Sequence, residues 1–233
     1  TLQNRQATRI GAVRYLNTKP LVHELARANP DIELSYDLPS RLADGLAAGR
    51  LDIGLVPTIE ILQNPAYTII SDACIACRGP VWSVKLFSRV PLERIKTLAL
   101  DEGSRTSAAL VQILLGEIHG VRPNLELLPI GNSAQDTTSD AVLLIGDRAI
   151  HPPSEKFAAV WDLGEVWRQW TNLPFVFAMW AACPGRDFTP IGDALTEEPG
   201  VAAVAQLMLQ EPGANERDAG EQSGDEWITE TQG

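Results

Sequence analysis

The sequence has few of the features that mark secreted or membrane-bound proteins. It holds three cysteines among 233 residues, an odd number that argues against a disulfide framework and favours a reducing compartment. Polar or charged residues interrupt every apolar run before it is long enough to span a bilayer. Residues 1–9 are polar and lack the pattern of a secretory signal. We therefore expect a cytoplasmic protein without a membrane partner.

Positive charge is also scarce. The chain has 19 basic and 30 acidic residues, a net charge of −11, which disfavours nucleic acid as a partner. Residues 211–233 hold seven acids and one base, and their few apolar residues predict a disordered tail. Because the net charge is negative, an anionic substrate would have to be held by local hydrogen-bond donors rather than by the electrostatic field of the whole protein.

Metal ligands do not occur at a recognisable spacing. His23, His119 and His151 are scattered along the chain. Cys74 and Cys77 form a C-x-x-C pair, but the pair lies in a strand-like run without a second pair of ligands. We expect buried thiols rather than a redox or zinc site, and no metal.

The apolar pattern alternates between strand and helix periods, which predicts an α/β fold with mostly parallel strands covered on both faces. Serines before two of the helical runs, Ser40 and Ser104, are candidate N-caps, and Gly49 is a candidate helix stop. The expected strands are 9–13, 32–38, 51–56, 67–76, 80–88, 97–101, 125–130, 141–145 and 175–182. The expected helices are 20–28, 40–48, one from 57, 105–118, 163–170 and 191–210.

One hydroxyl-rich segment lies between a predicted strand and the long helix that follows it. Ser104, Thr106 and Ser107 join the free amides and the dipole of the first helical turn, and Arg105 adds a positive charge. This combination suits a carboxylate or a phosphate. The alternative is an ordinary capped helix, which needs only Ser104.

Polar residues near other strand ends are further candidates, because ligands of open α/β sheets gather at the carboxyl ends of the strands. Arg14 and Asn17 follow the first strand, although Asn17 and Thr18 could simply cap a helix. Ser83 precedes the strand-like run 84–88, where a lone serine is usually structural. Asp147 follows a buried strand, where a salt bridge is the favoured reading and a ligand contact the alternative.

The run Gly49-Arg-Leu-Asp-Ile-Gly54 resembles a turn common in periplasmic-binding-protein type II domains. The resemblance implies two α/β lobes joined by two crossing strands, with the ligand between the lobes. Residues 84–88 and 175–179 are the expected crossings. The first lobe would then hold residues 1–87 and 180–210, and the second lobe residues 88–179. Residues 211–233 would form the acidic tail outside both lobes.

A longer set of segments resembles the chorismate dehydratases of the futalosine route to menaquinone, in the same order over residues 9–185. These segments are 9–17, 20–21, 52–57, 83–88, 104–107, 144–147, 162–167 and 171–180. Relatives usually continue through further helices that return to the first lobe, so we expect that lobe to be less complete here.

The resemblance implies a lyase that removes water from chorismate to give 3-(1-carboxyvinyloxy)benzoate. It needs no cofactor, because aromatisation drives the reaction. By the same analogy the substrate is bound by Arg14, Ser104, Arg105, Thr106, Ser107 and Asp147, and the reacting groups meet Asn17 and Ser83. Two alternatives stay open: a solute-binding protein or sensor for aromatic carboxylates on this fold, and the related 1,4-dihydroxy-6-naphthoate synthase.

Overall fold

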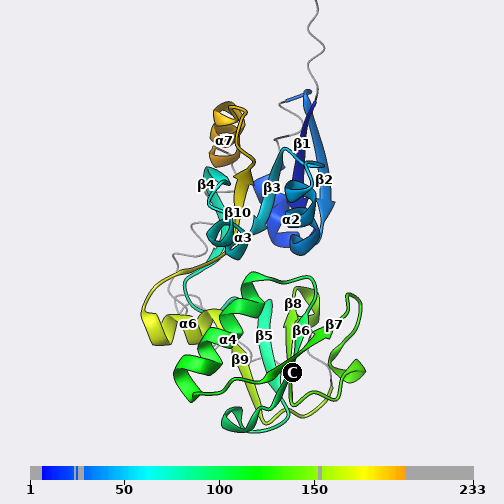
Figure 1. The fold of residues 1–233 in the computed structure, drawn as a ribbon, viewed down its shortest axis with the longest axis vertical. Coiled ribbons are helices and arrows are strands. Elements are labelled where there is room, and N and C mark those ends of the chain that lie inside the picture. Colours follow the sequence, from blue (N-terminus) through cyan, green and yellow to red (C-terminus); the bar gives the residue numbers. More distant parts are fainter. Residues whose placement is uncertain (1–6, 24, 26–28, 152–153, 198–233) are drawn as a thin grey trace, which may run out of the picture.

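The computed structural model describes residues 7–23, 25, 29–151 and 154–197, and forms two lobes that follow one another along the long axis (Figure 1). Each lobe is built on a five-stranded sheet, with strand orders β2-β1-β3-β10-β4 and β7-β6-β8-β5-β9. The predicted two-lobed α/β architecture is confirmed, since each lobe has its own sheet. As that prediction requires, the buried strands β3 (Ile53–Pro57) and β8 (Ala141–Ile145) lie in different sheets.

In the first lobe four strands run in one direction and one strand, β10, runs against them. β1 (Thr8–Val13) lies between β2 (Ile32–Asp37) and β3, parallel to both, while β10 (Phe175–Ala182) runs antiparallel to β3 and to β4 (Thr68–Cys77). Its core centres on Trp180, which is fully buried. The helices are η1 (Leu16–Leu21), α2 (Pro39–Ala47), α3 (Thr58–Gln63) and α7 (Thr189–Thr196).

The second lobe repeats this plan. β6 (Thr97–Asp101) runs parallel to β7 (Asn124–Leu128) and β8, and β5 (Val84–Ser88) is antiparallel to β8 and β9 (Ala159–Asp162). The helices are η2 (Leu92–Arg94), α4 (Thr106–His119), η3 (Ala134–Asp136), α5 (Asp147–Ile150) and α6 (Leu163–Thr171). Among the residues described in both lobes, no helix is long and apolar enough to cross a membrane.

The predicted crossing at 84–88 is wrong. β5 is paired along both edges within the second sheet, so it belongs to that lobe's core. The chain leaves the first sheet at the end of β4 and returns to it at the start of β10. Cys77 and Phe177 lie near these two points and pack into the hydrophobic core of the second lobe. The predicted boundaries at residues 87 and 180 therefore cut through β5 and β10.

Two predicted helix caps are also wrong. α2 begins at Pro39 after Leu38, and α4 begins after Arg105, in both cases without a side-chain cap from Ser40 or Ser104. Proline presets the helical φ at the first position of α2 and needs no N–H there. Gly49 ends the turn after α2 with a left-handed φ of 66°, as predicted. The predicted helices 20–28 and 191–210 fall partly, and the tail 211–233 wholly, outside the described residues.

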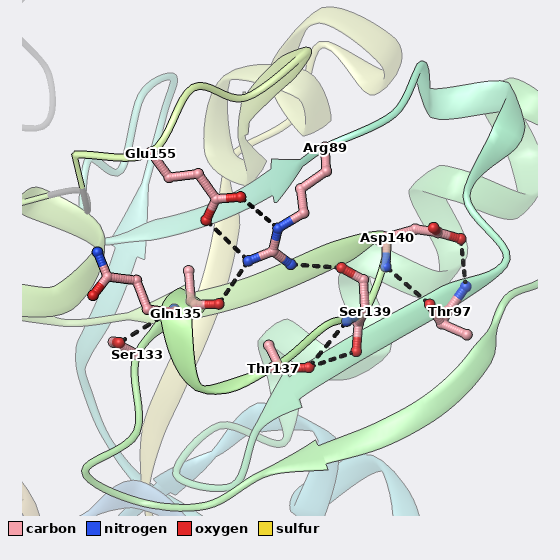
Figure 2. Close-up of polar contacts among 9 residues, drawn as sticks. Arg89, Thr97, Ser133, Gln135, Thr137, Ser139, Asp140 and Glu155 are labelled. Atoms are coloured by element: carbon pink, nitrogen blue, oxygen red, sulfur yellow. Dashed lines mark hydrogen bonds and ion pairs between the residues drawn. The ribbon is translucent and has the colours of Figure 1, made fainter.

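One arginine ties the amino end of β8 to the loops around it (Figure 2). The Arg89 guanidinium donates to both Glu155 carboxylate oxygens at 2.6 and 3.0 Å, and to the carbonyls of Ser139 and Ala134. Thr97 and Asp140 exchange hydrogen bonds beside it, which joins the starts of β6 and β8. These bonds join the loops at the end of the second sheet that is opposite the ends carrying Gly103 and Gly146.

Candidate functional site

The two lobes meet where their parallel strands end. The Tyr15 ring, just after β1, lies 3.0 Å from the position that a Cβ on Gly146 would occupy, and Gly146 directly follows β8. Leu38, just after β2, comes within 3.9 Å of the corresponding position on Gly103, after β6. Both sheets thus direct the carboxyl ends of their strands toward one junction, which is where ligands bind in open α/β sheets.

Three of the predicted site segments converge at Gly146. Its N–H donates to the Ser83 carbonyl at 2.8 Å, its neighbour Asp147 begins α5, and Tyr15 covers it from the first lobe. Its φ of 63° is left-handed, and a side chain there would also strike Tyr15, so both constraints favour glycine. The segment carrying Arg14 and Asn17 is therefore held beside those carrying Ser83 and Asp147.

The side chains of this group differ in exposure. Arg14, Asn17 and Asp147 are exposed, whereas Ser83 is half-buried and its hydroxyl donates to the Val81 carbonyl at 3.3 Å. The η1 helix follows Tyr15 and has no side-chain cap, so Asn17 and Thr18 do not cap it. The salt bridge expected near the end of β8 is made by Arg148, with the buried Asp101. Asp147 makes no ion pair with another described residue.

Two buried hydroxyls at this junction have no hydrogen-bond partner among the described residues. They are Thr18 Oγ1, beyond β1, and Thr58 Oγ1, at the start of α3 beyond β3. β1 and β3 are neighbouring parallel strands, so both hydroxyls lie at the same edge of the first sheet. Buried polar groups are normally satisfied, so these two hydroxyls are exceptions among the described residues.

The start of α4 offers further donors. Ser104, Thr106 and Ser107 are all buried, and the Thr106 hydroxyl accepts the N–H of Ile59 at 3.3 Å across the lobes. The hydroxyls of Ser104 and Ser107 make no hydrogen bond to other described residues. Together with the unpaired amides of the first turn, these two hydroxyls are available to an anion.

Arg105 turns toward the other lobe. Its guanidinium donates to Asp44 at 2.6 Å and to Glu60 at 2.9 Å, so two carboxylates of the first lobe already balance its charge. This geometry favours a role in joining the lobes over the predicted contact with substrate. Sequence reasoning missed Asp44 and Glu60, because nothing local marks acids that are 61 and 45 residues away.

Arg105→Met is expected to lower the free energy of unfolding by about 1 kcal/mol, because partly exposed ion pairs contribute little each and two are lost. The matched control is Arg41→Met, which removes one exposed pair with Asp37 at 3.7 Å and should cost less than about 0.5 kcal/mol. Urea unfolding at low and high salt measures both variants. The difference between them should shrink in high salt, and equal losses would contradict the bridging role.

Burial sets the protonation of two groups near the junction. It raises the pKa of the Tyr15 hydroxyl, and the neighbouring Asp101 carboxylate raises it further, so Tyr15 stays a neutral donor. Burial also raises the pKa of the Cys77 thiol to about 12. A protonated, buried thiol fits the predicted structural role of this cysteine better than redox or zinc chemistry. Within the described ranges no cluster of His, Cys, Asp and Glu could hold a metal ion.

Comparison with known proteins shows to which family the chain belongs. Residues 8–192 match the menaquinone biosynthesis family. The chorismate dehydratase of Thermus thermophilus is 34% identical over 189 residues, which cover 74% of this chain and 68% of that protein.

Solved structures are similar to this chain at lower sequence identity. The crystal structure of protein AF1704 from Archaeoglobus fulgidus is 16% identical with a TM-score of 0.64, over 88% of this chain and 78% of that one. A Candida albicans protein described as having the generic periplasmic binding protein fold is 13% identical with a TM-score of 0.49, over 86% and 71%. On the match over residues 8–192 and the identity to the Thermus thermophilus enzyme, the chain belongs to the menaquinone biosynthesis family.

Proposed function

We propose that this protein is a chorismate dehydratase, a cytoplasmic lyase that forms 3-(1-carboxyvinyloxy)benzoate in the futalosine route to menaquinone. The observation that carries the proposal is the 34% identity to the Thermus thermophilus chorismate dehydratase. The junction between the lobes supports it, because the segments that carry Asn17 and Ser83 both reach Gly146 there. Small-molecule binding between lobes also suits a chain with a net charge of −11, which disfavours nucleic acid and anionic membranes.

The reaction removes one ring hydrogen and the hydroxyl of the neighbouring carbon, so a C–H and a C–O bond break, a ring double bond forms and water leaves. Aromatisation supplies the driving force. The protein must therefore orient a dianion and assist proton transfer and hydroxide departure. Ser104, Ser107 and the first-turn amides of α4 hold one carboxylate, with Arg14 and Asp147 flanking the site. Asn17 and Ser83 bond the departing hydroxyl, and a carboxylate of the substrate takes the proton.

Incubation with chorismate tests the proposal directly. We expect chorismate to disappear as an aromatic product one water lighter appears, measured by chromatography with mass detection, at a rate proportional to protein concentration. Binding by calorimetry without turnover would instead favour a solute-binding or sensor role. Absence of both would contradict chorismate as the ligand, and the dihydroxynaphthoate synthase reaction would be assayed next.

A further inference from the structure

The turn before Ser83 has an unusual backbone. Trp82 has a φ of 63° and a side chain that is 68% exposed. The N–H of Ser83 donates to the Val81 carbonyl at 2.6 Å, so Trp82 is the central residue of a three-residue γ-turn with a positive φ. This region is unfavourable for a bulky side chain. Such conformations persist only where surrounding contacts hold them, and they concentrate at functional sites.

The contrast with Asn172 shows that the turn needs an explanation. Asn172 is the other non-glycine residue with a positive φ among those described, at 61°. It ends α6 in the left-handed position where asparagine is common, and its N–H bonds the Arg168 carbonyl as a normal helix cap. Trp82 follows no helix and has no such local cause.

A single carboxylate holds the turn. Asp162 Oδ2 accepts the N–H of Trp82 at 2.6 Å, and Asp162 Oδ1 accepts the N–H of Val81 at 2.9 Å. The same Oδ1 accepts the N–H groups of Gly164 and Glu165 and so caps α6. Asp162 therefore joins the start of α6 to the link that enters the second lobe.

Close packing keeps this link on α6. A Cβ on Gly164 would lie 2.4 Å from the Gly79 carbonyl oxygen and 2.6 Å from Cys77 Sγ, so the chain rests directly on the first turn of the helix. Beyond the turn, the Ser83 carbonyl is fixed by the N–H of Gly146. The conformation at Trp82 thus determines where the Ser83 hydroxyl lies between these two anchors.

We propose that Asp162 is a positioning residue, whose carboxylate holds the left-handed turn at Trp82 and thereby places Ser83 for the elimination. The inference rests on the proposed function, in which Ser83 assists departure of the hydroxyl. Among the described residues, the hydrogen bonds of the Asp162 carboxylate go only to backbone N–H groups of the turn and of α6, so it acts on the reaction through Ser83.

Asp162→Asn separates the two tasks of the carboxylate. The amide oxygen can replace Oδ1, keep the cap of α6 and still accept from Val81, because asparagine is as good an N-cap as aspartate. The amide nitrogen then replaces Oδ2. Because it is a donor and cannot accept the N–H of Trp82, the hydrogen bond that holds Trp82 in its left-handed conformation is lost. We expect kcat to fall at least about tenfold with KM changed by less than about threefold, since anion binding at α4 is untouched.

A double-mutant cycle distinguishes positioning from a general structural effect. Glycine adopts a φ of 63° without steric cost, so Trp82→Gly leaves a turn that needs no carboxylate to hold it. In this background Asp162→Asn should cost less than about threefold in kcat, whatever the loss of the ring does alone. Asn172→Gly is the control background, in which the full loss of about tenfold should remain.

The readouts are kcat and KM for chorismate, with the folded fraction measured by circular dichroism on the same samples. A loss confined to kcat that disappears in the Trp82→Gly background supports the proposal. A loss of less than threefold from Asp162→Asn, or equal losses in both backgrounds, overturns it while the proposed function stands. Failure of the wild-type protein to convert chorismate overturns the proposed function, and the inference with it.

Discussion

Ser83→Ala and Asn17→Ala are each expected to lower turnover of chorismate by about 10²–10⁴-fold, the usual contribution of a positioned group that assists proton transfer. Substrate affinity should change little, because the hydroxyls and amides at the start of α4 hold the carboxylate in either variant. Steady-state kinetics give the rates, and calorimetry with a slowly converted variant gives the affinity.

Controls for this pair come from the first lobe. Ser35 is an exposed serine on β2 whose hydroxyl bonds the Ile10 carbonyl at 3.3 Å, and Asn64 is an exposed asparagine whose side chain accepts the N–H of Ala66. Ser35→Ala and Asn64→Ala should keep turnover within about twofold, since surface changes away from the junction rarely matter. If Asn17→Ala and Ser83→Ala lose folded protein but keep turnover per folded molecule, their role is structural.

The buried strands and the long helix were predictable because their signals are local. β8 (Ala141–Ile145) is an unbroken apolar run, and all five of its residues are buried. α4 was predicted within one residue at each end, and Gly120 stops it with a left-handed φ of 67°. By contrast, α5 and β9 have four residues each, too few to show a period in the sequence.

The crossing strand was misplaced for a different reason. An apolar run such as 84–88 looks the same in the sequence whether it links two lobes or lies in the middle of one sheet. Its pairing with β8 and β9 involves residues more than fifty positions away, which no local pattern reveals. The same holds for Asp162, which meets Trp82 across 80 residues.

The candidate site was predictable as residue types rather than as contacts. Hydroxyls at the start of α4 follow directly from the strand–helix pattern, and two of the three are left without partners among the described residues. The role of Arg105 did not follow, because its charge is balanced by Asp44 and Glu60 from the other lobe. The residue types of this segment therefore predicted an anion site. Which of its side chains are free to bind an anion depends on contacts with distant residues, which only the structure reveals.

Two glycine-to-alanine substitutions in helices are expected to change stability in opposite directions. Gly192 lies in α7 against β4, where a Cβ would be 1.9 Å from the Ile70 carbonyl oxygen and 3.0 Å from its carbonyl carbon. Backbone atoms of a paired strand cannot turn aside as a flexible side chain can. Gly192→Ala should therefore cost about 3 kcal/mol of unfolding free energy, the upper end for overpacking.

Gly116 is the matched control, because it also lies within a helix, α4, but a Cβ there meets nothing within 4 Å. Gly116→Ala should raise the unfolding free energy by about 0.5–1 kcal/mol, since alanine loses less backbone entropy in a helix. Urea unfolding followed by circular dichroism measures both. A neutral Gly192→Ala would mean that α7 does not rest on β4 in solution. A destabilising result beside a stabilised Gly116→Ala would show that the penalty comes from the contact with Ile70, since both changes add the same methyl group to a helix.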